Sequence, residues 1–248
     1  MLPKISVITA TFNSAKTIHS TLLSLRCQEY SNFEHVVIDG LSTDNTLGII
    51  RESGVEGAVI DSRSDNGIYD ALNRGIELAT GDVIGFLHSD DFFPDSGVLE
   101  KIAGVFEDPS IEICFGDLAY VSRDDSARVV RRWTSGEFGP LRVKFGWMPP
   151  HPTFYVRREL LKRYPFNLDY QISGDYDAML RLLTREAAKV VYIPYELVHM
   201  RVGGASNKSL ANILKKTKED WRVIRSNGVG GVLTLAAKNV RKLPQFFV

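Results

Sequence analysis

Residues 65–91 read DNGIYDALNRGIELATGDVIGFLHSDD, and this stretch decides the fold. Its first part predicts a helix within residues 66–80, closed by Gly81, because glycine is common just after a helix. Its second part predicts an apolar strand over residues 83–87 that runs directly into acidic residues. A helix followed at once by a buried strand is typical of an α/β sheet.

The residues before this stretch repeat the same alternation. We predict strands over residues 5–10, 34–38 and 57–61, and helices over residues 15–27 and from the 42–44 cap to residue 50. Alternating strands and helices at this spacing indicate βαβ units and a parallel sheet. Runs such as VVI and VIGFL lack polar alternation, as expected for strands that are buried on both faces.

The second half of the chain is less regular. We predict strands over residues 111–115, 129–133 and 190–192, and helices over residues 159–164, 175–185, 209–227 and 232–243. The stretch GEFGPLRVKFGWMPPHP, residues 136–152, holds too many glycines and prolines for a long regular element.

Bulk composition indicates one soluble domain with an ample core, since the 248 residues are 44% hydrophobic and 24% charged. Cys27 and Cys114 are predicted to be buried core thiols in a reducing compartment. The sequence shows no secretory signal and no apolar run of about 20 residues. We therefore expect a cytoplasmic protein whose membrane contact, where it occurs, is made from the surface.

The tail from Lys208 to Val248 is strongly basic. It carries nine basic and two acidic residues, a net charge of +7 in a chain whose total is zero. A helix over residues 232–243 would have one apolar side, formed by Val232, Leu235, Ala236, Val240 and Leu243. Either this apolar side packs on the domain, as in an ordinary terminal helix, or the tail binds the anionic inner face of the cytoplasmic membrane.

Polar residues follow the predicted parallel strands at their carboxyl ends. They are Thr11 and Asn13 after the first strand, Asp39 after the second, and Ser89, Asp90 and Asp91 after the fourth. Because ligands bind beyond the carboxyl ends of the strands in open α/β sheets, we expect these side chains to meet in one crevice.

The adjacent acids Asp90 and Asp91 are suited to hold a divalent cation against a diphosphate, since Mg²⁺ uses one or two carboxylates plus substrate phosphates. The alternative is a pair of helix-capping acids before Pro94. Asp39 fits either a hydrogen bond to a nucleoside or an Asx turn with Gly40.

Further candidates lie in the second half. Asp175, with Asp177 beside it, opens a predicted helix and is either a cap or a catalytic base. Arg201 precedes Gly203-Gly204, which is either a phosphate-contacting loop or a hinge. His151 and His199 are each a ligand, a base or a structural residue.

Four segments together resemble family 2 glycosyltransferases of the GT-A fold: ISVITATFN (5–13), EHVVIDGLSTDNT (34–46), residues 65–91, and SGDYDAMLRL (173–182). The resemblance covers residues 4 to about 205 and is specific through the order and spacing of the four motifs. It is strongest to the bacterial branch that makes cell-surface polysaccharides and glycolipids.

The resemblance implies a role for each matching residue. Thr11 and Phe12 match positions that line the nucleotide base, and Asp39 matches the acid that binds the base or ribose. Asp90 and Asp91 match the end of the family's DXD motif for ribose and metal, with Asp91 as the metal ligand. Asp175 matches the catalytic base. Beside these matches, Asp177, His151, His199 and Arg201 are candidates for further contacts.

Two positions depart from the family pattern. His88 stands where the family often has an acid. Gly174-Asp175 stands where the base motif often reads Glu-Asp, and Asp177 offers a second acid two residues later.

The resemblance implies an α/β, Rossmann-like, mostly parallel sheet flanked by helices. We expect a GT-A domain over residues 1–207, with a nucleotide-binding half to about residue 115 and an acceptor half after it, and a basic helical extension over residues 208–248. The implied activity is inverting transfer of a sugar from a nucleotide donor, for which we expect a UDP-sugar, to a glycan or lipid-linked acceptor. Mn²⁺ or Mg²⁺ is the implied cofactor, and nucleic acid is not an expected partner.

Two rival functions combine similar features. A nucleotidyltransferase would have a basic glycine-rich loop after the first strand, where this chain has Ala10-Thr11-Phe12-Asn13. A catalytically inactive carbohydrate-binding relative would not need the acids Asp39, Asp90, Asp91 and Asp175.

Overall fold

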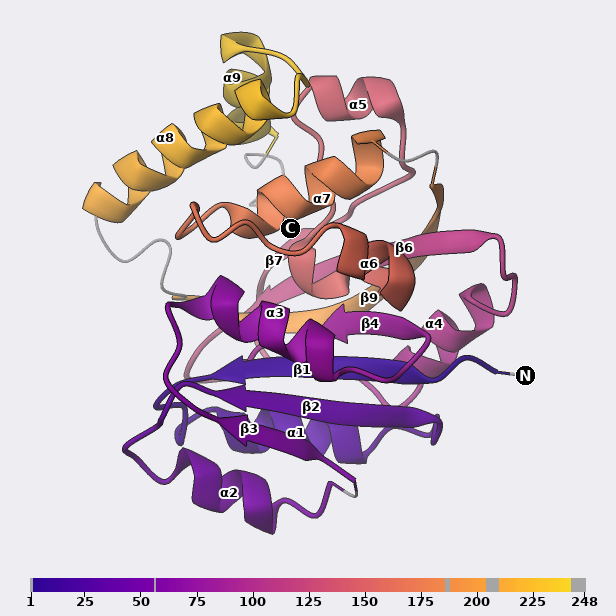
Figure 1. Ribbon diagram of the computed structural model, residues 1–248, viewed down its shortest axis with the longest axis vertical. Coiled ribbons are helices and arrows are strands. Elements are labelled where there is room, and N and C mark those ends of the chain that lie inside the picture. The colour runs from indigo at the N-terminus through magenta and orange to yellow at the C-terminus, as the bar shows by residue number, and fades with distance from the viewer. Residues whose placement is uncertain (1, 56, 186–187, 204–209, 242–248) are drawn as a thin grey trace.

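The computed structural model describes residues 2–55, 57–185, 188–203 and 210–241. Its first half alternates strands and helices (Figure 1), in the order β1 Ile5–Thr11, α1 Ile18–Arg26, β2 Phe33–Asp39, α2 Thr46–Glu52, β3 Val59–Ser62, α3 Ile68–Leu78 and β4 Val83–Phe86. The predicted βαβ units are therefore confirmed.

The second half adds further strands and helices, most of them short. In chain order they are β5 Asp91–Phe92, α4 Val98–Val105, β6 Ile111–Val121, β7 Val129–Trp133, α5 Pro140–Lys144, the 3₁₀ turn η1 His151–Thr153, β8 Tyr155–Arg157, α6 Arg158–Arg163, α7 Gly174–Arg185, β9 Lys189–Arg201, α8 Leu210–Ser226 and α9 Val232–Val240. The glycine- and proline-rich stretch holds only the single short helix α5 and the η1 turn.

One mixed sheet organises the described residues, with strand order β3-β2-β1-β4-β8-β6-β9-β5 and β7 paired with β6. Strands β1 to β4 are mutually parallel, and β6 and β9 run in the same direction as they do. Strand β8 is antiparallel to both of its neighbours, β4 and β6. The predicted mostly parallel sheet is confirmed.

Apolar side chains cover both faces of this sheet. Ile8 and Ala10 of β1 face a cluster that includes α3, α6 and α7, whereas Ile5 and Val7 face a cluster that includes α4 and Leu25 of α1. Figure 1 shows α3 in front of the sheet and α1 behind it. This arrangement explains why the parallel strands read as continuous apolar runs.

The two halves of the sheet meet where β4 pairs with β8. A Cβ atom at Gly85 would lie 2.0 Å from the Cε1 ring atom of Tyr155, so only glycine leaves room for this ring. Tyr155 is fully buried and its strand also pairs with β6. The contact between Gly85 and Tyr155 therefore seats the second half of the sheet against the first.

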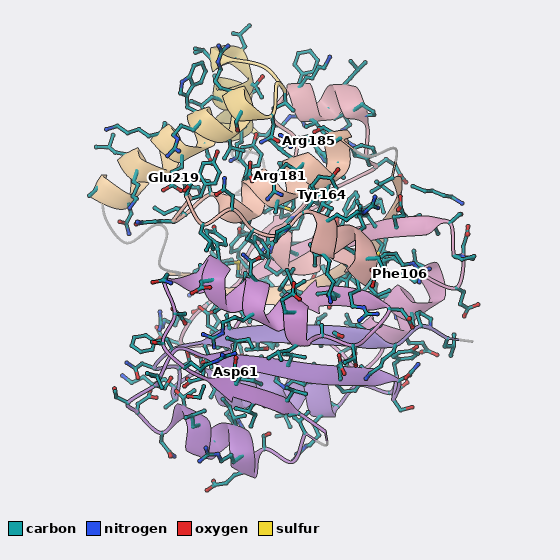
Figure 2. The ribbon with its side chains drawn as sticks, in the orientation of Figure 1. Asp61, Phe106, Tyr164, Arg181, Arg185 and Glu219 are labelled. Carbon is teal, nitrogen blue, oxygen red and sulfur yellow. The ribbon has the colours of Figure 1, made fainter. Side chains whose placement is uncertain are left out.

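The C-terminal helices pack on the domain through buried polar groups. Glu219 of α8 (labelled in Figure 2) accepts hydrogen bonds from the backbone N–H groups of residues 171–173, at 2.8–3.2 Å, in the loop before α7. Asp220 accepts one from the Ser173 hydroxyl at 2.8 Å. Val223 and Ile224 of α8 lie in the main core.

Lys238 fixes α9 to α8. Its Nζ lies 2.8 Å from the Asp220 carboxylate and 3.3 Å from the centre of the Tyr176 ring. Burial lowers the pKa of Lys238, and the Asp220 carboxylate opposes that effect. The described part of the tail helix packs on the domain through Lys238 and Leu235, whereas Val232, Ala236 and Val240 of the predicted apolar side are exposed. Leu243 lies outside the described residues, and the boundary at residue 207 remains a prediction.

Some elements of the structure differ from the prediction. The helices α4 and α5 and the short strands β5 and β8 were not predicted, and β9 is much longer than the predicted strand over residues 190–192. The prediction that Cys27 is buried is wrong, because Cys27 is exposed at the end of α1, whereas Cys114 is buried as predicted.

We predict that Gly85→Ala lowers the free energy of unfolding by about 1–3 kcal/mol or more, because the new methyl group overlaps the Tyr155 ring. Denaturant unfolding measures the change. Gly104→Ala is the matched control: it lies in α4 with open space around it, and alanine favours a helix by up to about 1 kcal/mol. Equal stability of the two variants would contradict the junction role of Gly85.

We predict that Lys238→Met costs about 3–5 kcal/mol of stability, because it leaves the buried Asp220 carboxylate without its cation. The double variant Lys238→Met/Asp220→Asn should recover most of the loss in thermal or denaturant unfolding. Lys218→Met, at an exposed position of α8, is the control and should change stability little. A Lys238→Met protein as stable as Lys218→Met would show that the pair contributes nothing.

Candidate functional site

Polar residues converge at the carboxyl edge of the parallel strands, as predicted. Thr11 and Asp39 are register partners at the ends of β1 and β2. The Asn13 side-chain oxygen accepts a hydrogen bond from the Thr43 N–H at 2.8 Å, and the Asn13 backbone N–H donates to the Ser42 hydroxyl. The hydroxyl groups of Ser14 and Ser89 lie 2.9 Å apart and connect this loop to the end of β4.

Asp39 is enclosed by its own turn. Its carboxylate accepts hydrogen bonds from the N–H and hydroxyl of Ser42, at 3.0 and 2.5 Å, and from the Ser62 hydroxyl at 2.7 Å. The residue has no exposed surface. The turn role that the sequence left open is therefore observed, and a direct nucleotide contact of Asp39 remains a proposal.

Phe12 forms the open surface above this turn. Its side chain is 61% exposed, which is high for a phenylalanine at the end of a buried strand, and it stands over Gly40. A Cβ atom at Gly40 would lie 3.5 Å from the Phe12 ring and 2.7 Å from the Asp65 carboxylate, so glycine lets these two side chains close over the turn. Thr11 is buried just below, with a hydroxyl that has no hydrogen-bond partner among the described residues.

The acids that follow β4 differ in their surroundings. Asp91 lies in β5, paired with Met200 of β9, and both of its carboxylate oxygens are buried without a partner among the described residues. Burial, together with the negative charge of Asp90, raises the pKa of Asp91 well above its ordinary value. Asp90 is partly exposed, and its backbone carbonyl accepts a hydrogen bond from Arg201 at 2.7 Å.

The alternative in which these acids cap a helix is wrong. Helix α4 begins only at Val98, and the turn before it is closed by Asp95, which accepts a hydrogen bond from the Gly97 N–H at 2.8 Å.

The residues fit a divalent cation only with help from a substrate. In the described ranges no three His, Cys, Asp or Glu side chains are placed to hold a metal by themselves. An acid pair with two unpartnered buried oxygens does fit a cation whose other ligands come from a diphosphate. Of the two acids, Asp90 offers the carboxylate that solvent and ligand can reach.

A cavity of about 560 Å³ lies next to these acids, between the ends of β4, β6 and β9 and the C-terminal helices. Its polar lining includes His88, His151, Asp175, Arg201, Asp220 and Lys238. Its apolar lining includes Tyr120, Trp133, Met148, Met179 and Met200. Residues from both halves of the chain and from both C-terminal helices therefore form one chamber.

Asp175 faces this cavity, and Asp177 does not. The Asp175 Oδ1 atom accepts hydrogen bonds from the Tyr176 N–H at 2.8 Å and from the Tyr69 hydroxyl at 3.3 Å. Asp177 is buried, and its oxygens accept hydrogen bonds from Arg181 at 2.7 Å and Asn227 at 2.9 Å. The geometry favours Asp175 as the acid that a substrate can reach.

Two histidine rings form the cavity wall between the acids. The rings of His88 and His151 have centres 5.5 Å apart, and His151 also stacks on Phe86 at 5.4 Å. Desolvation lowers the pKa of His151 to about 4, although the Asp175 charge opposes this. Burial also lowers the pKa of His88 against the charges of Asp90 and Asp175. Both rings are therefore neutral at pH 7.

The other two predicted contact residues, Arg201 and His199, lie in different surroundings. Arg201 lines the cavity and lies over the Phe92 ring at 4.8 Å while it holds the Asp90 carbonyl. His199 packs edge-on against Phe92 and lies 3.3 Å from Glu196, away from the cavity lining. His199 is thus a structural residue of the β5–β9 pair. The glycine loop after Gly203 lies outside the described residues.

The sequence did not point to several residues in and beside the cavity. Tyr69 touches Asp175 from 106 positions away, and Asp220 and Lys238 enter from the tail. Tyr69 stands within the quoted 65–91 motif, which offered a signal, whereas the pairing of Asp220 with Lys238 follows only from how α8 and α9 pack.

Comparison with known proteins assigns the chain to a family. The family model described as glycosyl transferase family 2 matches residues 6–189. A PGL/p-HBAD biosynthesis glycosyltransferase of Mycobacterium bovis is 32% identical over 211 residues, covering 83% of this chain and 80% of that protein. An uncharacterized glycosyltransferase of Mycobacterium tuberculosis is 32% identical over 189 residues, covering 72% and 68% respectively.

Solved structures share the fold at low identity. TarS of S. aureus superposes with a TM-score of 0.71 at 22% identity, over 91% of this chain and 39% of TarS. The mannosyltransferase PcManGT from Pyrobaculum calidifontis superposes with a TM-score of 0.69 at 19% identity, over 99% of this chain and 71% of that one. These likenesses confirm the predicted GT-A fold.

The family match runs from β1 to the start of β9, and so contains the converging strand ends, the acid pair and Asp175. The described helices include none that is long and apolar enough to cross a bilayer. Sequence, fold and site agree, and the chain is a glycosyltransferase that belongs to glycosyl transferase family 2.

Proposed function

We propose that this enzyme transfers a sugar, with inversion at the anomeric carbon, from a nucleoside diphosphate sugar to a hydroxyl group of a glycan or lipid-linked acceptor. The observation that carries the proposal is the single chamber in which Asp175 faces the carboxyl edge of the parallel strands. Structures of the same fold support the donor class, since one TarS structure is in complex with UDP-GlcNAc and the PcManGT structure with GDP-Man and Mn²⁺. We favour a UDP-sugar as donor.

In this proposal the nucleoside lies on the loop after β1 and β2. Phe12 supplies an exposed aromatic face for the base, and Thr11 and the Asp39 turn form the floor below it. Asp39 then acts chiefly by holding Ser42 and Ser62 in place, because its carboxylate is fully engaged by them.

Asp175 is the proposed general base. As the acceptor oxygen forms its bond to the anomeric carbon, the bond from that carbon to the diphosphate oxygen breaks, and the hydroxyl proton passes to the Asp175 carboxylate. The Tyr176 N–H holds one oxygen of this carboxylate, and the Tyr69 hydroxyl, which donates to the Ile172 carbonyl at 2.7 Å, lies 3.3 Å from the same oxygen. The other oxygen is left for the proton. Neutral His88 and His151 beside it do not neutralise its charge.

Asp90 is the carboxylate we propose to hold Mn²⁺ or Mg²⁺. The resemblance favoured Asp91, but the burial of both Asp91 oxygens and the partial exposure of Asp90 support Asp90. Bound there, a divalent cation would neutralise the charge that develops on the leaving nucleoside diphosphate. Arg201 fixes the Asp90 backbone and adds a positive charge at the same edge of the cavity.

The acceptor is proposed to carry an apolar portion. Trp133, Met148, Met179 and Met200 line the chamber, and methionine side chains adapt to irregular apolar ligands. The M. bovis relative takes its name from PGL/p-HBAD biosynthesis, which fits glycolipid synthesis at the inner face of the cytoplasmic membrane.

A direct assay tests the function. Purified enzyme with Mn²⁺ is screened against a set of nucleotide sugars by thermal shift, and the stabilising donor is then incubated with candidate acceptors while nucleoside diphosphate release is followed. We expect release that depends on acceptor. Pyrophosphate release instead would indicate a nucleotidyltransferase, and donor binding without turnover would indicate an inactive relative.

We predict that Asp175→Asn keeps donor-induced thermal stabilisation and loses at least about 10²-fold in transfer rate, since an amide cannot accept the acceptor proton. Asp177→Asn is the matched comparison. Because Asp177 binds Arg181 and Asn227, its variant should lose stability while the folded fraction keeps activity. A larger loss of transfer in folded Asp177→Asn than in Asp175→Asn would overturn the assignment.

We predict that Asp90→Asn abolishes the extra thermal stabilisation that Mn²⁺ gives in the presence of UDP. Asp91→Asn should keep most of it and should itself raise the melting temperature of the metal-free protein at pH 8. The sign follows because a carboxyl group whose pKa is raised by folding destabilises the protein once the pH exceeds its unfolded value, near 3.9.

The Asp91→Asn advantage should therefore shrink as the pH falls through the raised pKa of the folded protein and vanish below the unfolded value of about 3.9, where the wild-type carboxyl group is protonated in both states. Loss of the Mn²⁺ effect in Asp91→Asn with its retention in Asp90→Asn would restore Asp91 as the ligand.

A further inference from the structure

Helix α9 packs on the domain mainly through polar side chains and exposes apolar ones. Its inward side is polar: the buried Thr234 hydroxyl donates to the Lys144 carbonyl at 2.8 Å, Lys238 pairs with Asp220, and just past the helix Arg241 donates to the Phe145 carbonyl at 2.9 Å. A helix on a soluble domain ordinarily buries its apolar side and exposes its polar one.

The outward side of α9 is apolar. Val232 is 69% exposed, Leu233 is 85% exposed and Val240 is 60% exposed, and Ala236 is exposed between them. The stripe expected from the sequence included Leu235, but Leu235 packs against the core instead. The exposed stripe is therefore displaced around the helix from the expected one.

Helix α5 extends this apolar surface. Leu141 and Phe145, one turn apart, are 68% and 63% exposed. The carbonyl groups of Lys144 and Phe145 receive the hydrogen bonds from Thr234 and Arg241, so α5 and α9 lie in contact (top of Figure 1). Two elements distant in sequence thus expose large apolar side chains at one end of the molecule.

The exposed charges around this surface are basic, with one acidic exception at its edge. The acids of the described part of α8 and α9 are Glu219 and Asp220, and both are buried. The exposed charged residues of the two helices and of the end of α5 are basic: Lys144, Lys215, Lys218, Arg222, Arg225 and Arg241. Glu137, ahead of α5, is an exposed acid at the edge of this region.

We propose that the outward faces of α5, α8 and α9, hereafter the C-terminal face, dock on the surface of an anionic lipid bilayer. Charge complementarity selects this occupant, because exposed apolar side chains ringed by bases match the boundary between anionic headgroups and acyl chains. The face lies outside the catalytic cavity, which Lys238 lines from the other side of α9. The proposal stands independently of the transfer chemistry.

Vesicle co-sedimentation tests the proposal with the whole protein. We expect binding to vesicles of phosphatidylglycerol mixed with phosphatidylcholine, little binding to phosphatidylcholine alone, and release at about 1 M salt, where the Debye length falls to about 3 Å. Equal binding to both vesicle types, or no binding to either, would overturn it.

Two sets of variants locate the contact. Leu141→Ser/Phe145→Ser/Leu233→Ser and, separately, Lys218→Glu/Arg225→Glu should each weaken partitioning by about tenfold or more. The matched controls are Leu2→Ser/Leu168→Ser and Lys16→Glu/Arg51→Glu, which change exposed residues elsewhere and should bind as wild type. The melting temperature of each variant reports whether it has folded, and the charge-reversal set keeps the test decisive where the serine set does not fold.

A second copy of the chain is the competing occupant. Sedimentation velocity that shows a concentration-dependent dimer, lost in Leu233→Ser, would mean that the C-terminal face joins two copies and would overturn the membrane proposal. Variants of the C-terminal face that bind vesicles as tightly as the controls would overturn it as well.

Discussion

The contact between Gly85 and the Tyr155 ring is the constraint on which the rest of the structure depends. Strand β4 carries Gly85 and leads directly to His88 and the acid pair, whereas β8 carries Tyr155 and follows the η1 turn that begins at His151. Because the two strands pair beside this contact, the carboxyl edge of the parallel strands and the second half of the cavity are held at a fixed distance from each other. The stacking of His151 on Phe86 and its approach to His88 are consequences of that registry.

How much of this arrangement can be predicted depends on the range of the interactions that make it. Buried apolar runs such as VVI and VIGFL identify β2 and β4 from the local sequence alone. The ends of these strands are therefore predictable, and so is the convergence of Thr11, Asp39 and the acid pair. Strands β5 and β8 have two and three residues and are too short for any periodicity; they exist because β9 and β6 offer them partners. Cys27 reads as apolar in sequence, but it follows the last turn of α1 and faces outward.

Residue roles within the site were harder to predict for the same reason. Asp90 and Asp91 are equivalent in sequence, and only the pairing of β5 with β9 turns Asp91 inward. Asp175 and Asp177 are two positions apart on one helix, so they point in widely different directions, and the location of the cavity and of Arg181 decides which acid a substrate meets. The resemblance identified the family and the fold correctly, whereas a choice between two acids of one motif depends on the tertiary structure.

The buried acids show where a cation is still required. Glu219 is compensated by backbone N–H groups, Asp220 by Lys238, and Asp177 by Arg181. Within the described residues, the buried carboxylate of Asp91 has no side-chain partner and lies next to Asp90, and Arg201 offsets this only in part, since the pKa of Asp91 stays well above its ordinary value. The other buried acids have compensating partners, whereas this pair, where the strand ends meet, is not fully compensated. A metal–diphosphate complex bound there would supply the missing cation.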